Sequence, residues 1–217
     1  PRLPMTANRM GIPSFGSLRI IKLSEGQMSF TPLSIQGSWV FTPKKFDDER
    51  GSFHEVFKLS SISETLGIDF QVKQVNQSVS KAGVIRGIHW ADVPPGQAKY
   101  VFCPRGSIWD IVVDIRVGSP TFGKWDADVI SEKNGKAILI KEGLGHVFLA
   151  LEDNTVVNYL CNEPYNPTSE YEINPFDETI DIPFADKWNA SEFLTSPKDA
   201  DAYSLAEANI KGLLPKH

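Results

Sequence analysis

From Ser38 onward the chain is a succession of short β-rich runs separated by turn residues. The runs span residues 39–42, 72–75, 99–103, 108–115, 137–140, 146–151 and 155–160. The turns between them carry Gly51, Gly83, Gly106, Gly118-Ser119-Pro120, Asn134-Gly135 and Asp153-Asn154. A crossover helix between parallel strands needs roughly ten or more residues, so this spacing favours antiparallel hairpins. The pattern predicts an all-β sandwich or barrel.

Helical patterning is confined to two short segments. Residues 60–66 predict a helix with Ser60 or Ser61 as its cap and Gly67 after its last turn. A second helix is predicted over residues 204–210, ended by Gly212. Residues 164–197 are rich in proline, asparagine and acidic residues, which indicates an excursion packed on the barrel and not a second domain.

Size and charge limit the class of protein. A chain of 217 residues with 41% hydrophobic content can bury the core of one sizeable domain. The net charge of -5 argues against nucleic acid as a partner, which would need a basic face. We find no apolar window long enough for a membrane span and no signal peptide, and therefore expect a soluble, cytoplasmic protein. Cys103 and Cys161 lie in apolar runs and are expected to be core thiols.

The first residues differ from the rest of the chain. Residues 1–27 are rich in Gly, Pro, Ser and basic residues and show no clear periodicity. We interpret them as a leader or extension, possibly non-native, ahead of a single domain over residues 28–217 that begins near Met28.

The segments 83–90 and 94–100 place an imidazole, His89, and an amine, Lys99, one short loop apart. A base and a cation at one site suit proton abstraction beside a carbonyl, because the cation stabilises the enolate oxygen. Strand alternation would send Arg86 to the face opposite His89. A bulge at Gly87 would bring both side chains to the same face.

Other candidate residues allow more than one interpretation. His146 opens a strand after a glycine-rich turn, and Tyr159 and Tyr165 are core or lid aromatics unless their positions make them acids. Metal-binding β-barrels of the cupin class use a His-x-His pattern with a nearby Glu, but Ala91 occupies the place of the second histidine. His89 and His146 alone are too few for a protein-only metal site, so we expect none.

Taken together, the motifs are similar to those of the dTDP-4-dehydrorhamnose 3,5-epimerase family, and the resemblance covers residues 33–215. The motifs, in order, are 48–55 (DERGSFHE), 74–78 (QVNQS), 84–89 (VIRGIH), 94–100 (PPGQAKY), 118–125 (GSPTFGKW), 142–148 (EGLGHVF), 159–167 (YLCNEPYNP) and 197–200 (PKDA). Trp90, and the segment 174–182, depart from the usual family pattern.

The resemblance implies a cupin jelly roll, that is, a double-stranded β-helix with a few short peripheral helices, and a homodimer that shares strands between subunits. It implies no metal and no organic cofactor. The implied substrate is a dTDP-4-keto-6-deoxyhexose, and the implied reaction converts dTDP-4-dehydro-6-deoxy-D-glucose to dTDP-4-dehydro-L-rhamnose.

Matched to the family position by position, His89 is the expected catalytic base and Asp199 the carboxylate that orients it. Lys99 is expected to stabilise the enolate, and Tyr159 to return a proton on the opposite face of the ring. His146 is an expected substrate contact. The expected contacts to thymidine or diphosphate are Arg50, Glu55, Gln74, Asn76, Arg86, Tyr165, Glu170 and Lys198.

Several alternatives stay open on the sequence. Epimerisation at C3 or C5 alone would use most of the same framework, although the presence of both His146 and Tyr159 favours the double reaction. A sugar 3,4-ketoisomerase, a non-catalytic sugar-nucleotide-binding cupin and a metal-dependent cupin oxygenase are the other candidates.

Overall fold

The computed structural model describes residues 29–188 and 193–217, so the predicted leader, residues 1–27, lies outside the described residues. One sheet has six strands in the spatial order β1 (Ser29–Pro32), β2 (Ser38–Thr42), β10 (Ala137–Ile140), β7 (Lys99–Arg105), β12 (Thr155–Cys161) and β5 (Gln74–Ser80). The other has five, in the order β13 (Glu170–Glu172), β6 (Ile85–Ala91), β11 (Gly145–Ala150), β8 (Ser107–Val113) and β9 (Trp125–Ser131). Neighbouring strands pair antiparallel in both sheets, which confirms the all-β jelly roll.

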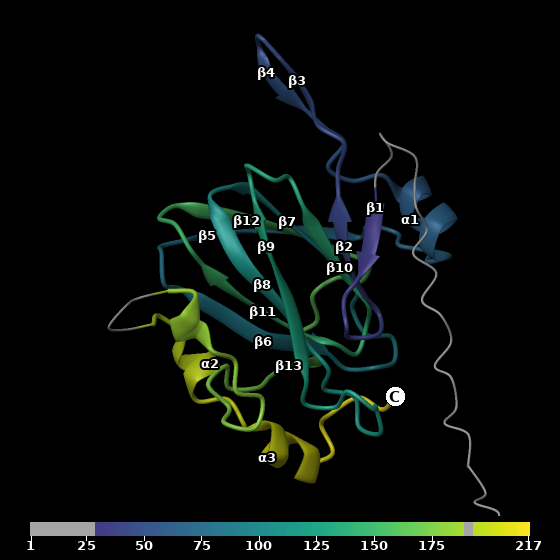
Figure 1. Cartoon of the computed structure of the whole chain (residues 1–217). Helices are drawn as coiled ribbons and strands as arrows, with labels where there is room; N and C mark the ends of the chain where they lie inside the picture. The colour runs from purple at the N-terminus through teal and green to yellow at the C-terminus, as the bar shows by residue number, and fades with distance from the viewer. Residues whose placement is uncertain (1–28, 189–192) are drawn as a thin grey trace, which may run out of the picture.

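The two sheets pack face to face around an inner core (Figure 1). Strand alternation decides which side chains enter it. In β10, Ile138 and Ile140 belong to the inner core, whereas Ala137 and Leu139 lie on the outer face of the six-stranded sheet. Cys103 lies in the inner core, and both cysteines are buried and unpaired, as predicted.

Both outer faces are covered in part as well, which explains why several strands are apolar along their whole length. Helix α1 (Leu59–Leu66) and Phe70 cover the six-stranded sheet. The C-terminal part of the chain covers the five-stranded sheet with Ile180 and with the 3-10 helix η1 (Phe184–Asp186) and helix α3 (Leu205–Ile210). The excursion predicted over residues 164–197 packs on the barrel wherever it is described.

The helix ends agree in part with the prediction. Gly67 ends α1 in the left-handed conformation (φ 68°), but the helix begins at Leu59 with Lys58 at the cap position, so the predicted serine cap is wrong. Leu59 packs against the apolar cluster on the outer face of the six-stranded sheet, and the helix begins one residue earlier than predicted. Ser204 caps α3 and forms a capping box with Glu207.

Two further elements matter for the site. Helix α2 (Pro197–Ala200) lies beside β6 and was not predicted. Strands β3 (Phe46–Asp48) and β4 (Gly51–Phe53) form a hairpin that projects away from both sheets (Figure 1). None of the described helices is long and apolar enough to cross a membrane.

Candidate active site

A β-bulge at Gly87 sets the direction of the functional side chains of β6. Arg86 is paired with Phe148 and His89 with His146, so three steps along β6 match two steps along β11. The extra residue turns Arg86 and His89 toward the same face of the sheet. The sequence allowed a bulge at Gly87 without requiring it, and the register shift between β6 and β11 shows that one is present.

Only glycine fits the bulge. Gly87 has φ +125°, a conformation that side chains with a Cβ rarely adopt. A Cβ at this position would collide with the carbonyl oxygen of His146 and would lie 2.7 Å from the Cα of Val147. The orientation of His89 thus depends on the absence of a side chain two residues earlier.

Helix α2 brings Asp199 to His89. The Nε2 atom of His89 lies 2.6 Å from Oδ1 of Asp199, although the two residues are far apart in sequence. The Ser196 hydroxyl accepts a hydrogen bond from the backbone N–H of Asp199 and starts the helix. The His89 side chain is 38% exposed and that of Asp199 only 5%, so the imidazole remains accessible while its partner is buried.

The pKa of Asp199 is lower than that of an ordinary carboxyl group. Burial alone raises this pKa, but the hydrogen bond and charge of His89, together with the Gly87 amide, outweigh it. The carboxylate is ionised near neutral pH, so the shared proton resides on Nε2 of His89. The Nδ1 atom then keeps a lone pair and can act as a base.

Lys99 lies on the inner face of the opposite sheet. It begins β7, in the same alternation as Val101 and Cys103, which belong to the inner core. Burial lowers the pKa of the Lys99 amine, and the nearby acidic groups, Glu170 first among them, oppose this effect. An amine in this position can stabilise a negative oxygen far better than it could in water.

Tyr159 projects from β12 on the same inner face. Its hydroxyl lies 3.2 Å from Oγ of Ser78, and its ring meets the ring of His146 edge-on at a centroid distance of 5.9 Å. Burial raises the pKa of the Tyr159 phenol, so it is protonated at neutral pH. A neutral phenol on one sheet therefore faces the imidazole-bearing inner surface of the other.

His146 forms a second, deeper histidine–aspartate pair. Its Nε2 lies 2.6 Å from Oδ1 of Asp110 on the neighbouring strand β8, and both side chains are almost completely buried. The other oxygen of Asp110 is buried and has no hydrogen-bond partner among the described residues. A carboxylate in this position adds negative charge beside the inner faces of Lys99 and Tyr159.

Three of the predicted nucleotide contacts lie together at β5. The side chains of Gln74 and Asn76 point to the inner face, because these residues pair with Cys161 and Tyr159 of β12. The Gln74 amide donates to Oδ1 of Asn76 (2.7 Å), and its oxygen accepts from the Tyr165 N–H (2.8 Å). The loop that carries Tyr165 is thereby fixed to β5.

Three more of them lie around β6. Arg86 donates from Nε to the Ser80 hydroxyl at 3.1 Å. Glu170 of β13 is paired with Ala91 of β6, and Glu172, two residues further along β13, is paired with His89. Lys198 precedes Asp199 and lies 2.9 Å from the carboxylate of Glu172.

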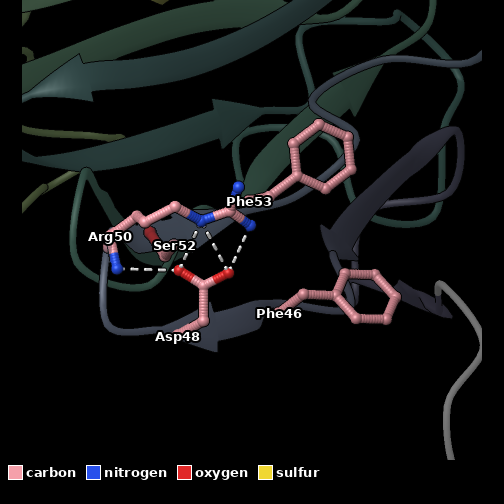
Figure 2. A pocket seen from close by; sticks show the side chains of 6 residues that line it. Phe46, Asp48, Arg50, Ser52 and Phe53 are labelled. Carbon is pink, nitrogen blue, oxygen red and sulfur yellow. Dashed lines mark hydrogen bonds and ion pairs between the residues drawn. The ribbon is translucent and has the colours of Figure 1, made fainter.

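Two predicted contacts do not join the others within one chain. Arg50 is in the projecting hairpin, where it folds back on Asp48 (Figure 2) and is 85% exposed. Glu55 precedes Val56, whose carbonyl accepts from the Tyr100 hydroxyl on the outer face of the six-stranded sheet. That face is opposite the one that carries Lys99.

The described residues contain no group of three or more His, Cys, Asp or Glu side chains arranged to hold a metal ion. Each of the two histidine–aspartate pairs is joined by a hydrogen bond of 2.6 Å.

The model of the family described as dTDP-4-dehydrorhamnose 3,5-epimerase matches residues 32–207 of this chain. The chain belongs to this epimerase family. Its cupin-type jelly roll and the order of its motifs agree with that membership.

Individual members of the epimerase family are similar over most of their length. A dTDP-4-dehydrorhamnose 3,5-epimerase of Mycolicibacterium smegmatis is 50% identical over 87% of this chain and 91% of its own length. The structure of a 4-keto-6-deoxy sugar epimerase of Streptomyces spheroides matches with a TM-score of 0.84 and 42% identity, over 90% of this chain and 96% of that one. A 3'-monoepimerase of Streptomyces bikiniensis in complex with dTDP-quinovose matches with a TM-score of 0.80 and 44% identity, over 85% and 92% of the chains.

Sequence reasoning missed two residues of this epimerase site. Asp110 is a charged residue in the middle of an apolar strand, and a buried unpaired charge is costly enough to have signalled a partner. Ser78 gave no comparable signal, because a serine in a polar strand is unremarkable without knowing what lies opposite.

Proposed function

We propose that this protein is a dTDP-4-dehydrorhamnose 3,5-epimerase that converts dTDP-4-dehydro-6-deoxy-D-glucose to dTDP-4-dehydro-L-rhamnose without a metal or an organic cofactor. Family membership and the similarity to the Mycolicibacterium enzyme support the reaction. The observation that carries the proposal is the 2.6 Å hydrogen bond between His89 of the five-stranded sheet and Asp199 of helix α2. Tyr159 and Lys99 lie on the opposing six-stranded sheet.

In the first step, Nδ1 of His89 takes a proton from a carbon beside the C4 ketone. The C–H electron pair forms a double bond to C4, and the electrons of the carbonyl double bond move to the ketone oxygen, which becomes negative. Asp199 stabilises the imidazolium that results, because its carboxylate accepts a hydrogen bond from Nε2–H and its negative charge offsets the new positive charge. A positioned base of this kind contributes about 10²- to 10⁴-fold to the rate.

Lys99 stabilises the enolate oxygen in the same step. The ammonium group is buried, so its attraction for the developing charge is weakly screened. Deprotonation at C3 or at C5 places the negative charge on this same oxygen. One lysine can therefore stabilise the enolate in both epimerisations.

Tyr159 completes the inversion. Its phenol returns a proton to the carbon from the face opposite His89, since the two side chains come from opposing sheets. Removal on one face and return on the other inverts the carbon. His146 contacts the sugar beside Tyr159 and is held in place by Asp110.

The nucleotide lies toward the ends of β5 and β6. Arg86 and Lys198 bind the diphosphate, because cationic side chains form charge-assisted hydrogen bonds with phosphate oxygens. Gln74, Asn76 and Tyr165 form a connected group that supports a role in thymidine binding. Glu170, which borders Lys99, contacts the same ligand.

We further propose a homodimer in which the β3–β4 hairpin reaches the site of the second subunit. Phe46 and Phe53 of the hairpin are 52% and 67% exposed, and an isolated two-stranded hairpin is marginally stable in water. A partner subunit would cover both rings and bring Arg50 to a diphosphate. Glu55, two residues after Phe53, would follow the hairpin.

Residues 28–217 are proposed to act as one catalytic domain in the cytoplasm. The two unpaired cysteines support this location, because structural disulfides are rare in the reducing cytosol.

Deuterium incorporation tests the reaction and its alternatives together. With dTDP-4-dehydro-6-deoxy-D-glucose in D₂O, the protein should introduce deuterium at both C3 and C5 and form the L-rhamno product. A non-catalytic sugar-nucleotide binder would bind dTDP without any exchange, and a 3,4-ketoisomerase would yield a 3-keto sugar. Either result would contradict the proposal.

Epimerisation at one carbon is the second candidate. It is favoured by the 44% identity to the 3'-monoepimerase of Streptomyces bikiniensis, which is close to the identity to several double epimerases. Deuterium at C3 only, with the configuration at C5 unchanged, would establish this activity instead.

A further inference from the structure

The inner face of β5 carries a row of polar side chains that contact the candidate site. We call Gln74, Asn76, Ser78 and Ser80 the β5 polar row. These residues alternate with Val75, Gln77 and Val79, which are exposed on the outer face. β5 is the edge strand of the six-stranded sheet, and among the described strands only β12 pairs with it. The polar row faces the opposing sheet because its members pair with the inward residues of β12.

Three members of the row each contact a different group of the candidate site. Gln74 accepts a hydrogen bond from the backbone of Tyr165, and Ser80 accepts one from Nε of Arg86. Ser78 is hydrogen-bonded to the Tyr159 hydroxyl at 3.2 Å. Gln74 has an expected role in nucleotide binding, whereas Ser78 has none so far.

The Ser78 contact is specific to the phenol. Ser78 Oγ is the only hydrogen-bond partner of the Tyr159 hydroxyl within residues 29–188 and 193–217. The edge-on contact with the His146 ring limits the ring plane but leaves the O–H bond free to rotate. Either hydroxyl can donate in this contact; when Ser78 donates, the Tyr159 oxygen is the acceptor and its own proton is directed elsewhere, so Ser78 can control where this proton points.

We propose that Ser78 is a positioning residue for the inverting step, which orients the Tyr159 hydroxyl before proton return and stabilises the phenolate afterwards. The proposal rests on the acid role of Tyr159 in the proposed function. It assigns a task to a side chain that does not touch the reacting carbon.

The proton balance requires such a partner. As the phenol O–H bond breaks, the new C–H bond forms, and the negative charge of the enolate ends on the Tyr159 oxygen. The Ser78 hydroxyl then donates a hydrogen bond to that oxygen, and water supplies the proton that restores the phenol. Burial raises the pKa of Tyr159 and makes an unaided phenolate costly, while the Ser78 hydrogen bond opposes that rise.

The test separates proton removal from inversion. Wild type, Ser78→Ala, Ser78→Thr and Tyr159→Phe are incubated with dTDP-4-dehydro-6-deoxy-D-glucose in D₂O, and NMR follows deuterium uptake and configuration at each carbon. Ser78→Ala should keep its exchange rate, because His89 is intact, while the ratio of inversion to exchange falls about tenfold. Ser78→Thr keeps a hydroxyl and should restore the ratio to within about twofold.

Gln77→Ala is the matched control, because Gln77 lies on the outer face of the same strand and is exposed. It should leave both rates unchanged. Ser80→Ala removes the partner of Arg86 and should raise KM without altering the ratio. Thermal unfolding of each variant confirms that the strand is folded.

The outcomes distinguish the positioning role of Ser78 from the acid role of Tyr159 on which it rests. An unchanged ratio in Ser78→Ala, or an equal fall of exchange and inversion, would overturn the positioning role, because a general structural defect lowers both rates together. Failure of Ser78→Thr to restore the ratio would do the same. Normal inversion by Tyr159→Phe would instead refute the acid role of Tyr159.

Discussion

Asp199 determines which ring nitrogen of His89, the proposed base, faces a carboxylate. Its hydrogen bonds to His89 and the Gly87 amide keep the pKa of the carboxyl below the ordinary value, in spite of burial. A carboxyl group whose pKa is lower in the folded state stabilises that state above the unfolded pKa of about 3.9. This contribution is lost as the pH falls through the folded pKa, so acid should weaken both the dyad and the fold around it.

Asp199→Asn is expected to lower kcat by about 10²- to 10⁴-fold, because an amide cannot stabilise the His89 imidazolium. The variant should also lose less of its stability than wild type between pH 7 and pH 3. Steady-state kinetics and urea unfolding at the two pH values measure both effects. A variant with wild-type kcat, or with the same acid sensitivity, would contradict the role of this carboxylate.

At the scale of elements, strands with apolar inner and outer faces were predictable, and polar ones were not. β10 was predicted over its observed span, residues 137–140, because both of its faces are buried. β5 was predicted over residues 72–75 but runs from Gln74 to Ser80, since its polar inner row and exposed outer valines resemble a loop. β9 was missed for a similar reason, as most of its residues are only partly buried.

The bulge at Gly87 in β6 orients His89, the proposed base. Gly87→Ala is expected to lower the free energy of unfolding by about 2 kcal/mol or more, since the added Cβ meets backbone atoms of β11. His89 would then leave its alignment with Asp199, and kcat should fall with stability. Urea unfolding and initial rates measure the two losses.

Gly118→Ala is the control for the bulge. Gly118 also has a positive φ, but a Cβ there meets nothing within 4 Å, so only the backbone strain of about 1–2 kcal/mol applies. Equal effects of the two substitutions on kcat would show that the bulge does not orient the base.

On the scale of the whole molecule, the site is assembled from both sheets and from the C-terminal segment. His89 and Lys99 were predictable as a pair because one loop joins their strands. Periodicity could not connect this pair to Asp199, because only the fold brings Oδ1 of Asp199 to 2.6 Å from Nε2 of His89. The expected role of Asp199 came from the family resemblance. Arg50 is on the β3–β4 hairpin, which projects away from both sheets (Figure 1).

Mixed subunits test the action of Arg50 across a dimer. His89→Ala and Arg50→Ala should each be nearly inactive alone, but in a mixed dimer one site would combine an intact His89 with an intact Arg50 from the partner. Random reassociation of equal amounts should restore about a quarter of wild-type activity. No recovery on mixing, or a monomer in sedimentation analysis, would contradict the shared site.

The rate of deuterium entry into the 4-keto sugar in His89→Ala tests the central claim most directly. His54→Ala is the matched control, because His54 lies next to Gly135, away from the inner faces of the two sheets. We predict that His54→Ala exchanges C3 and C5 at the wild-type rate and that His89→Ala shows no exchange at either carbon. Exchange at the wild-type rate in His89→Ala would show that another group removes the proton, and would contradict the account.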